Sequence, residues 1–184
     1  MISDAVAYIR REVVAYLGVA DTDVVAGNIP LLKEDANARG LYVSVVNLEE
    51  EHTLRNTGHA LRQNGAVRYQ EPPVHLNVYL LFAAAFDNYE TGLLRLSQAI
   101  ELFQSRRVFE AATASPGIAF PVSLERLIFD FYDLTLEQLN HLWGVLGGAY
   151  FPSALYKVRL VTIQRDVTLA GPEITGIHLE TRLR

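Results

Sequence analysis

Cysteine is absent from this chain of 184 residues, and its absence removes several classes of function at once. A chain without cysteine has no disulfide, no cysteine-ligated zinc or iron–sulfur site and no thiol nucleophile. Long hydrophobic runs are absent too, because the longest, VYLLFAAAF at 78–86, is about half the roughly 18 residues of a membrane span. Basic charge is in deficit: 16 Lys and Arg stand against 21 Asp and Glu, which argues against a broad phosphate-binding surface.

The remaining composition is typical of a globular protein, with half of the residues hydrophobic and a fifth charged. A chain of this length can bury a core as one domain, so we expect a single domain over 1–184, with residues 53–73 as a protruding arm. The N-terminal sequence MISDAVAYIRREVV places charges where a signal peptide requires an unbroken apolar run. This pattern predicts synthesis in the cytoplasm.

Hydrophobic spacing predicts a first helix near the N-terminus. Its apolar stripe comprises Ile2, Val6, Ile9, Val13 and Leu17. Ser3 or Asp4 is expected to cap this helix, and Gly18 to end it. The opposite, charged face is expected to expose Glu12 to solvent.

Two further helices are predicted where a polar residue precedes Glu or Gln by three positions, the spacing of a capping box. Asp87 with Glu90 opens the second, and Thr135 with Gln138 opens the third. Their apolar stripes comprise Leu93, Leu96, Ile100 and Phe103 in the second helix, and Leu136, Leu139, Leu142, Trp143 and Leu146 in the third.

Alternating or β-branched segments predict the strands of a sheet. They lie at 41–48, 73–86, 124–134, 153–166 and 174–184. Residues 19–40 read as a long loop, because Gly27, Pro30 and Gly40 interrupt any pattern there. The order of elements predicts an α+β fold, in which about three helices pack on a mixed or antiparallel sheet.

Residues 53–73 predict a β-hairpin that protrudes from this body as an arm. The segment carries three arginines against one glutamate, contains the turn signal Asn64-Gly65 and ends at Pro72-Pro73.

The sequence VVNLEEEHTLRN at 45–56 leads into the arm and concentrates three carboxylates beside a histidine. On a strand, Glu49 and Glu51 share one face, while Glu50 and His52 share the other. One metal ion would therefore meet at most two of the carboxylates. The simpler interpretation is a strand that extends past its sheet as a charged, solvated segment and faces the arginines of the arm.

Catalytic chemistry has weak support in the sequence. His75 and Asn77 share a strand face, and a polar cleft near them is the alternative, small-molecule enzyme hypothesis, but no nucleophile lies nearby. The sequence holds no phosphate loop, nucleophile elbow, zinc-protease or dinucleotide-binding motif. We therefore expect no enzyme, no cofactor and no metal.

A third hypothesis concerns the C-terminal strands, which are basic on one face and have aromatic residues interleaved. The residues are Lys157, Arg159, Arg165, Arg182 and Arg184, with Tyr150, Phe151 and Tyr156. Such a face can bind single-stranded nucleic acid. It can equally meet an acidic protein neighbour, which is the interpretation that we favour.

Three stretches, taken together and in order, resemble one known family. They are LYVSVVNLEEEHTLRN, PPVHLNVYLLFAAAFDNYETGLLRLSQAIELFQSRRVF and FDFYDLTLEQLNHLWGVLGGAYFPSALYKVRLV. They are similar to the N-terminal domain of the cap, or tube-terminator, proteins of extracellular contractile injection systems, which are phage-tail-like particles. Relatives often continue past this core, whereas this sequence ends at Arg184, so contacts of an extension are not carried over.

The resemblance implies assembly. It implies a tail-terminator-like subunit that closes into a homo-hexameric ring, sits on the last ring of inner-tube protein and meets the end of the sheath, with neither nucleic acid nor membrane as a partner. It also implies release of the protein from the cell as part of a particle. We expect the subunit interface at Glu49, Glu50, Glu51, His52, Arg55, Arg62 and Arg68. We expect tube or sheath contacts at Lys157, Arg159 and Arg165.

Overall fold

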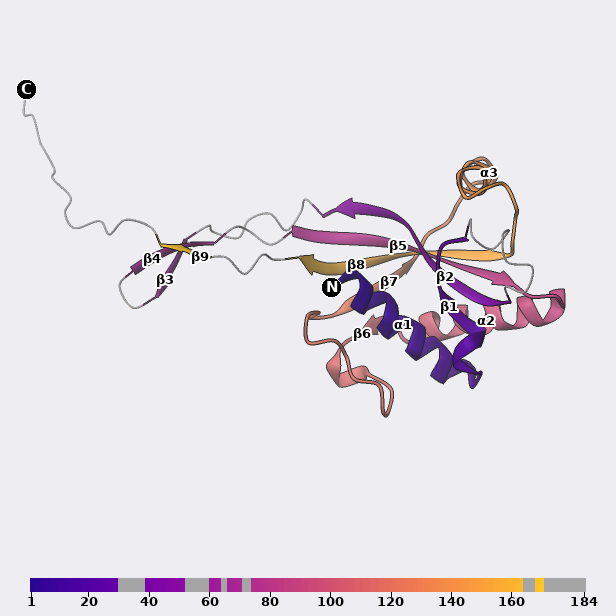
Figure 1. Cartoon of the computed structure of the whole chain (residues 1–184), viewed down its shortest axis with the longest axis horizontal. Helices are drawn as coiled ribbons and strands as arrows, with labels where there is room; N and C mark the ends of the chain where they lie inside the picture. Colours follow the sequence, from indigo (N-terminus) through magenta and orange to yellow (C-terminus); the bar gives the residue numbers. More distant parts are fainter. Residues whose placement is uncertain (30–38, 52–59, 64–65, 71–73, 164–167, 171–184) are drawn as a thin grey trace, which may run out of the picture.

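A six-stranded sheet forms the body of the protein in the computed structural model, which describes residues 1–29, 39–51, 60–63, 66–70, 74–163 and 168–170 (Figure 1). In spatial order the strands are β1 (Val24–Ala26), β2 (Gly40–Glu50), β5 (Val74–Ala85), β8 (Ser153–Ile163), β7 (Leu127–Phe131) and β6 (Val108–Phe109). The helices are α1 (Ile2–Leu17), α2 (Tyr89–Ser105) and α3 (Leu136–Val145). The predicted α+β class with three packed helices is confirmed.

The central strand, β5, pairs antiparallel with β2 on one side and β8 on the other, and both of its faces are buried over most of its length. Helices α1 and α2 cover one face, where Val78, Leu80 and Phe82 join the larger core. Helix α3 covers part of the other face, where Trp143 packs with Leu81. Burial of apolar area on both faces explains why this segment is a long, nearly continuous apolar run.

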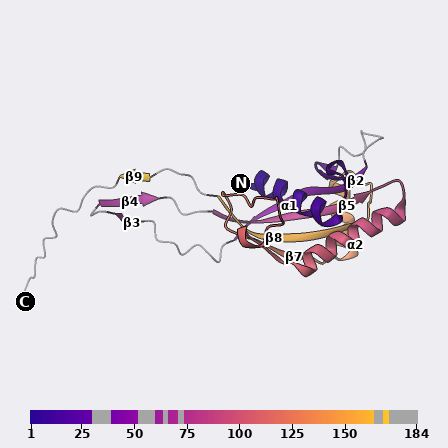
Figure 2. The same ribbon diagram turned by 90° about the horizontal axis from the view of Figure 1, so that it is seen from below.

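A second, three-stranded sheet lies off one end of the body, and Figures 1 and 2 agree on this separation. We call it the arm sheet; its strands are β3 (Ala60–Gln63), β4 (Ala66–Gln70) and β9 (Thr168–Ala170), with β4 in the middle. Strands β3 and β4 form the predicted hairpin, in which Gln63 pairs with Ala66 across a two-residue connection. Strand β9 was not predicted.

The arm sheet repeats the strand order of the body, because β3 follows β2, β4 precedes β5, and β9 follows β8 along the chain. Body order β2-β5-β8 thus becomes arm order β3-β4-β9. The third strand of the arm sheet, β9, follows β8 along the chain, and β8 already lies beside β5 in the body.

The prediction of a loop over 19–40 was wrong in part, since β1 lies within it and pairs parallel with β2. A three-residue strand carries too short a pattern to be read from sequence. Gly40 begins β2 with φ of 135°, and a Cβ added there would lie 2.7 Å from the Asp23 carbonyl oxygen. Glycine therefore permits the close approach of the two chain segments.

Two predicted helix caps are displaced. Helix α1 begins at Ile2, so Met1 is its N-cap rather than Ser3 or Asp4, and Asp4 lies in its first turn. Asn88, not Asp87, caps α2 by accepting a hydrogen bond from the Thr91 N–H at 2.8 Å. The capping box of Thr135 and Gln138, by contrast, is confirmed.

Two of the predicted apolar stripes are only partly buried. Leu93 of α2 is 38% exposed, and Gly92, Ala99 and Leu102 of that helix are buried instead. Only Trp143 of α3 is buried, while Leu136 is 86% exposed. The apolar stripe of α3 is therefore wider than the surface that this helix buries against the body.

The prediction that Glu12 is exposed was wrong, because its side chain is fully buried beneath the segment that follows α2. Its carboxylate accepts hydrogen bonds from the Ser115 N–H (3.0 Å), from the Ser115 hydroxyl (2.6 Å) and from the Arg106 guanidinium. Burial alone would raise the pKa of Glu12, but these donors hold the pKa below its usual value of 4.5. The guanidinium also lies 4.3 Å from the centre of the Phe109 ring.

Replacing Glu12 by glutamine is expected to lower the free energy of unfolding by about 3 kcal/mol, because it leaves Arg106 without its buried counter-charge. Urea denaturation at neutral pH measures this loss. Asp21→Asn is the matched control: it breaks the Arg10–Asp21 pair, whose carboxylate is 70% exposed, and is expected to cost less than about 1 kcal/mol.

The pH dependence of the free energy of unfolding, compared between the wild type and Glu12→Gln, provides a second test. A lowered pKa in the folded state stabilises above pH 4.5, and this contribution is lost as the pH falls through the folded-state value. The stability gap between the wild type and Glu12→Gln should therefore narrow between neutral pH and pH 3. A gap that stays constant would show that the charge of Glu12 does not stabilise the fold.

Candidate functional site

The face of the sheet that α3 covers is left open at the end nearer the arm, and polar side chains line it there. We call five of them the polar row: Glu49, Tyr79, Asp130, Lys157 and Arg159. The pairing register places Tyr79 directly opposite Lys157, and Lys157 directly opposite Asp130. Directly paired residues point to the same face, so four strands contribute to one surface.

At one end of the polar row, β2 is bound to β5 and β8 through its glutamates. The Tyr79 hydroxyl donates to Glu49 Oε2 at 2.6 Å, and Lys157 Nζ donates to the same oxygen at 3.1 Å. The Asn77 side-chain amide donates to Glu51 Oε2 at 3.0 Å. Each contact joins β2, or Glu51 directly after it, to β5 or β8, so together the contacts hold the open face as one network.

The ionisation of this network follows from its hydrogen bonds. The Tyr79 hydroxyl and then Lys157 lower the pKa of Glu49. Burial, together with the hydrogen bond to Glu49, raises the pKa of Tyr79. Burial would lower the pKa of Lys157, but Glu49 raises it. Glu49 and Lys157 therefore stay oppositely charged over a wide pH range.

Asp130 organises the other end of the polar row. It forms an ion pair with Arg159 Nε at 2.6 Å and accepts a hydrogen bond from Arg107, which precedes β6. Burial would raise the pKa of Asp130, but the two arginines lower it. The charges of this end are thus paired within the chain, as are those of Glu49 and Lys157.

The structure answers the question that the glutamate run raised. Strand β2 stays paired with β5 through Glu50, and the Glu51 N–H still donates to the His75 carbonyl oxygen at 2.8 Å. The strand therefore does not leave its sheet at Glu49, and within the described part of the chain Glu49 contacts Tyr79 and Lys157. Among the residues that the structure describes, no three acidic or histidine side chains gather as a metal site would require.

Other predicted site residues fall on the arm or beyond the described ranges. His52, Arg55 and Arg165 lie outside the described residues. Arg62 lies on β3 and Arg68 on β4, so the hairpin brings the strands that carry them side by side.

The structure gives the two alternative hypotheses no new support. The amide of Asn77 is occupied by Glu51, and Asn77 is 1% exposed, so its side chain does not line an open cleft with His75. For the nucleic-acid hypothesis, Lys157 and Arg159 are paired with carboxylates. The ring of Tyr156 is buried in the larger core and is therefore not available to stack on a nucleobase.

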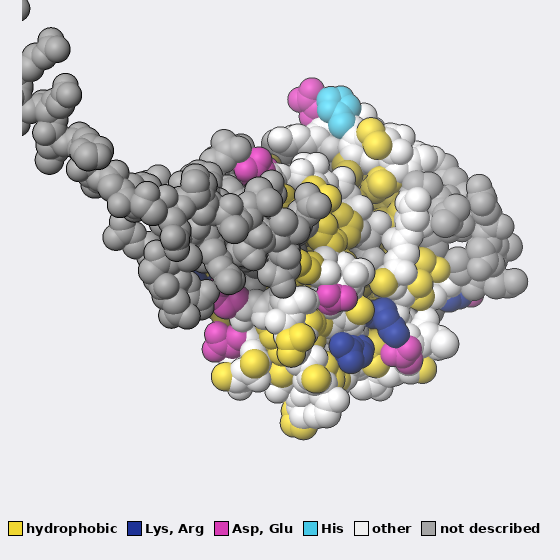
Figure 3. Space-filling view, turned by 60° about the vertical axis from the view of Figure 1, so that its left-hand side comes forward, with side chains coloured by type: hydrophobic (Ala, Val, Ile, Leu, Met, Phe, Trp, Pro, Cys, Tyr) yellow, Lys and Arg dark blue, Asp and Glu magenta, His cyan; other side chains and the backbone are white. Residues whose placement is uncertain are grey.

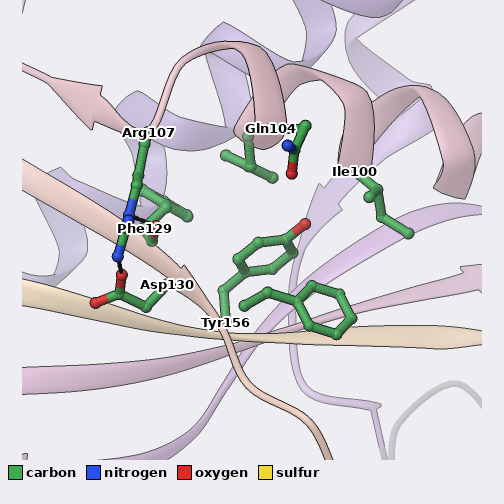
Figure 4. Close-up of a pocket in the computed structure, with 8 residues that line it drawn as sticks. Ile100, Gln104, Arg107, Phe129, Asp130 and Tyr156 are labelled. Atoms are coloured by element: carbon green, nitrogen blue, oxygen red, sulfur yellow. Dashed lines mark hydrogen bonds and ion pairs between the residues drawn. The ribbon is translucent and has the colours of Figure 1, made fainter.

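A groove on the opposite side of β7 was not predicted. Its cavity has a volume of about 700 Å³ and lies between α2 and the strands β7 and β8 (Figure 4). Its apolar lining comprises Ile100, Phe103, Phe129, Phe131 and Tyr156. The ring of Tyr156 points toward Ile100 and Gln104, while Arg107 reaches Asp130 at one side. We call this cavity the aromatic groove.

Sequence reasoning missed the contacts that Tyr79, Asp130 and Arg107 make along the polar row. Alternation alone places Tyr79 and Asp130 on strand faces, but only the register of three strand pairs brings them beside Glu49 and Arg159.

No helix within the described ranges is both long enough and apolar enough to cross a bilayer.

Comparison with known proteins gives one family match and matches to four chains of solved structures, including the following two. The family model for the Pvc16 N-terminal domain matches residues 4–175. The PVC sheath/tube terminator of an extracellular contractile injection system, in its extended state, matches with a TM-score of 0.67 and 15% identity over 100% of this chain and 64% of that chain. The tube-terminating cap of the anti-feeding prophage matches with a TM-score of 0.63 and 18% identity over 96% of this chain and 59% of that chain.

The sequence spans less than two thirds of either matched chain. At such low identity the likeness establishes the fold. A search of curated proteins returned no match.

Replacing Tyr79 by phenylalanine is expected to raise the pKa of Glu49, because the hydroxyl hydrogen bond is the largest of the influences that lower it. Side-chain carboxyl NMR shifts followed from pH 7 to pH 2 measure the change. Tyr16→Phe, on the exposed part of α1, is the control and should leave the Glu49 titration where it is. Identical curves for all three proteins would exclude the Tyr79–Glu49 hydrogen bond in solution.

Proposed function

Because this chain belongs to the Pvc16 N-terminal domain family, we propose that it is a structural cap that ends the inner tube of a contractile injection particle. In this role six copies of the chain close into a homo-hexameric ring, which sits on the last ring of tube protein and against the end of the sheath. The observation that carries the proposal is the fold match to two terminators over 96% to 100% of this chain.

The distribution of polar contacts supports an assembly role. The charges of the polar row are paired within the subunit, so its attraction for a distant ion or substrate is weak. A surface of alternating, mutually fixed charges suits the alignment of a protein neighbour, because complementary charges set register and exclude wrong partners. We propose that Lys157 and Arg159, with Arg165, meet the tube or the sheath through this surface. No step of this role requires catalysis, a cofactor or nucleic acid.

The arm suits ring closure. A heterologous contact repeated around a ring needs two different patches on each subunit, one that donates and one that receives. The arm sheet lies apart from the body and is the natural donor (Figures 1 and 2). We propose that its root at Glu49, Glu50, Glu51 and His52, and its arginines Arg55, Arg62 and Arg68, take part in this contact.

Figure 3 views the body from the side on which the arm lies. Hydrophobic, acidic and basic side chains are mixed there rather than separated into regions. Mixed character is typical of interfaces that form between folded subunits. Synthesis in the cytoplasm followed by incorporation into a particle accords with this role.

Removal of the chain from a producing cell tests the terminator role. We expect particles with tubes of uncontrolled length, or no particles, because nothing then stops the addition of tube protein. Tube lengths measured on negatively stained particles provide the readout, and re-expression of the chain provides the control. Tubes of unchanged length and unchanged spread would refute termination.

The native mass and its response to charge reversal test the ring. We expect a ring mass of about 123 kDa, six times the chain mass of 20.5 kDa, by light scattering of the purified protein or of caps released from particles. Lys in place of Glu49, Glu50 and Glu51 is expected to lower the ring fraction, because it inverts the charge at the root of the arm.

The matched control reverses three exposed glutamates elsewhere, Glu90, Glu101 and Glu125, and should keep the ring. Thermal unfolding verifies that both triple variants fold. A ring that survives the first triple reversal would remove the glutamates from the subunit interface.

A further inference from the structure

The edge of β7 is only half covered. Strand β6 pairs with Leu127 and Ile128 alone. The Arg107 carbonyl oxygen accepts from the Phe129 N–H at 2.9 Å, and beyond this point no described strand lies on the outer side of residues 130–132. An uncovered strand edge is a template for pairing with another chain.

The backbone of Phe131 is the centre of this free edge. The Phe129 N–H points outward, to Arg107, and the Tyr132 N–H points inward, to the Leu155 carbonyl oxygen at 2.9 Å. Because backbone groups alternate along a strand, the N–H and C=O of Phe131 point outward as well. The side chain of Phe131 is 53% exposed, which is unusual for a phenylalanine of a six-stranded sheet.

Two cavities flank this edge, one on each face of the sheet. The aromatic groove lies on the α2 face, and a cavity of about 240 Å³ lies on the α3 face, where Tyr132, Leu134 and Leu139 line it. Phe131 borders both. Successive side chains of an added strand point to opposite faces, so cavities on both faces beside one edge suit β-strand addition rather than a helix or a small ligand.

The arm sheet has an edge strand that can pair with another chain. Within the described residues its strands pair only with one another, and β3 has a strand neighbour on one side only, which is β4. A two-stranded hairpin is marginally stable in water, and the third strand, β9, adds only three residues. Pairing of β3 with a further strand would supply backbone hydrogen bonds along its other side.

Charge distinguishes β3 from β9 as the pairing edge. Strand β3 carries Arg62, whereas β9 carries no charge. The receiving segment at 127–137, LIFDFYDLTLE, contains no basic residue, and although Asp130 is already paired with Arg107 and Arg159, it also carries Asp133 and Glu137. Opposite charges across paired strands stabilise the pair and select its partner.

We infer that β3 of a second copy of this chain adds to the free edge of β7 at residues 130–132, beside the aromatic groove. The inference rests on the proposed ring and names its receiving surface. Around the ring, each arm sheet extends the body sheet of the next subunit, so backbone hydrogen bonds carry the contact and the two flanking cavities receive side chains.

Disulfide trapping tests the contact directly, because the natural chain has no cysteine to interfere. Phe131→Cys is combined in turn with Leu61→Cys, Arg62→Cys and Gln63→Cys, and the purified proteins are oxidised and run on non-reducing gels. Paired residues in antiparallel strands have Cα atoms about 4.5–5.5 Å apart, within the range for a disulfide. The control pairs Phe131→Cys with Tyr16→Cys, which lies exposed on α1.

We expect at least one of the three pairs to give intermolecular disulfides at about ten times the control yield, because assembly holds the two thiols together. Equal yields in all pairs would overturn the inference. A wild-type ring that forms while no pair exceeds the control would overturn the receiving surface and leave the ring standing. Trapped dimers of the cysteine variants, together with a wild type that never forms a ring, would support the edge contact and refute ring closure.

A second pair of variants tests the backbone role of Phe131. Phe131→Pro removes the outward N–H without touching a hydrogen bond to β8, whereas Phe131→Thr keeps that N–H and removes the ring. Thermal unfolding checks that both proteins fold. We expect proline to abolish the trapping of Tyr132→Cys with the arm cysteines, and threonine to preserve it. Equal trapping in the two backgrounds would overturn pairing through the backbone.

Discussion

Pairing and burial on both sides of strand β5 organise the body of the protein. This strand is paired along both edges by β2 and β8, and the apolar cores bury both of its faces. Its register places Tyr79 between Asn47 and Lys157, and so determines which side chains meet on the open face. The strands β3, β4 and β9 of the arm sheet are neighbours of these three strands along the chain and lie in the same order, so the strand order of the body is repeated in the arm sheet.

The buried carboxylate of Glu12 connects the helical layer to the edge of the sheet. It holds Arg106, and the next residue, Arg107, binds the Phe129 carbonyl oxygen and Asp130. These contacts position β6, which ends the coverage of β7 at Ile128. The stability of the helix-facing core and the extent of the free edge are therefore linked through two adjacent arginines.

Much of the fold follows from local pattern. The alternation at 73–86 predicts β5, and the capping box of Thr135 and Gln138 predicts the start of α3, because both signals involve residues only a few positions apart. The same reasoning fails for Glu12, whose helix position predicts exposure. Its burial depends on Ser115, a residue 103 positions away, which supplies two hydrogen bonds.

Local pattern was enough to predict the fold class, the central strands, the hairpin signal at Asn64-Gly65 and the family resemblance, because hydrophobic period and turn chemistry are local properties. Pairing of segments far apart along the chain was needed to show that Glu49 binds Lys157, 108 positions away, and that no described strand pairs with β7 beyond Phe129. Pairing of distant strands sets both features, since a shift of register by one residue would turn each side chain to the other face.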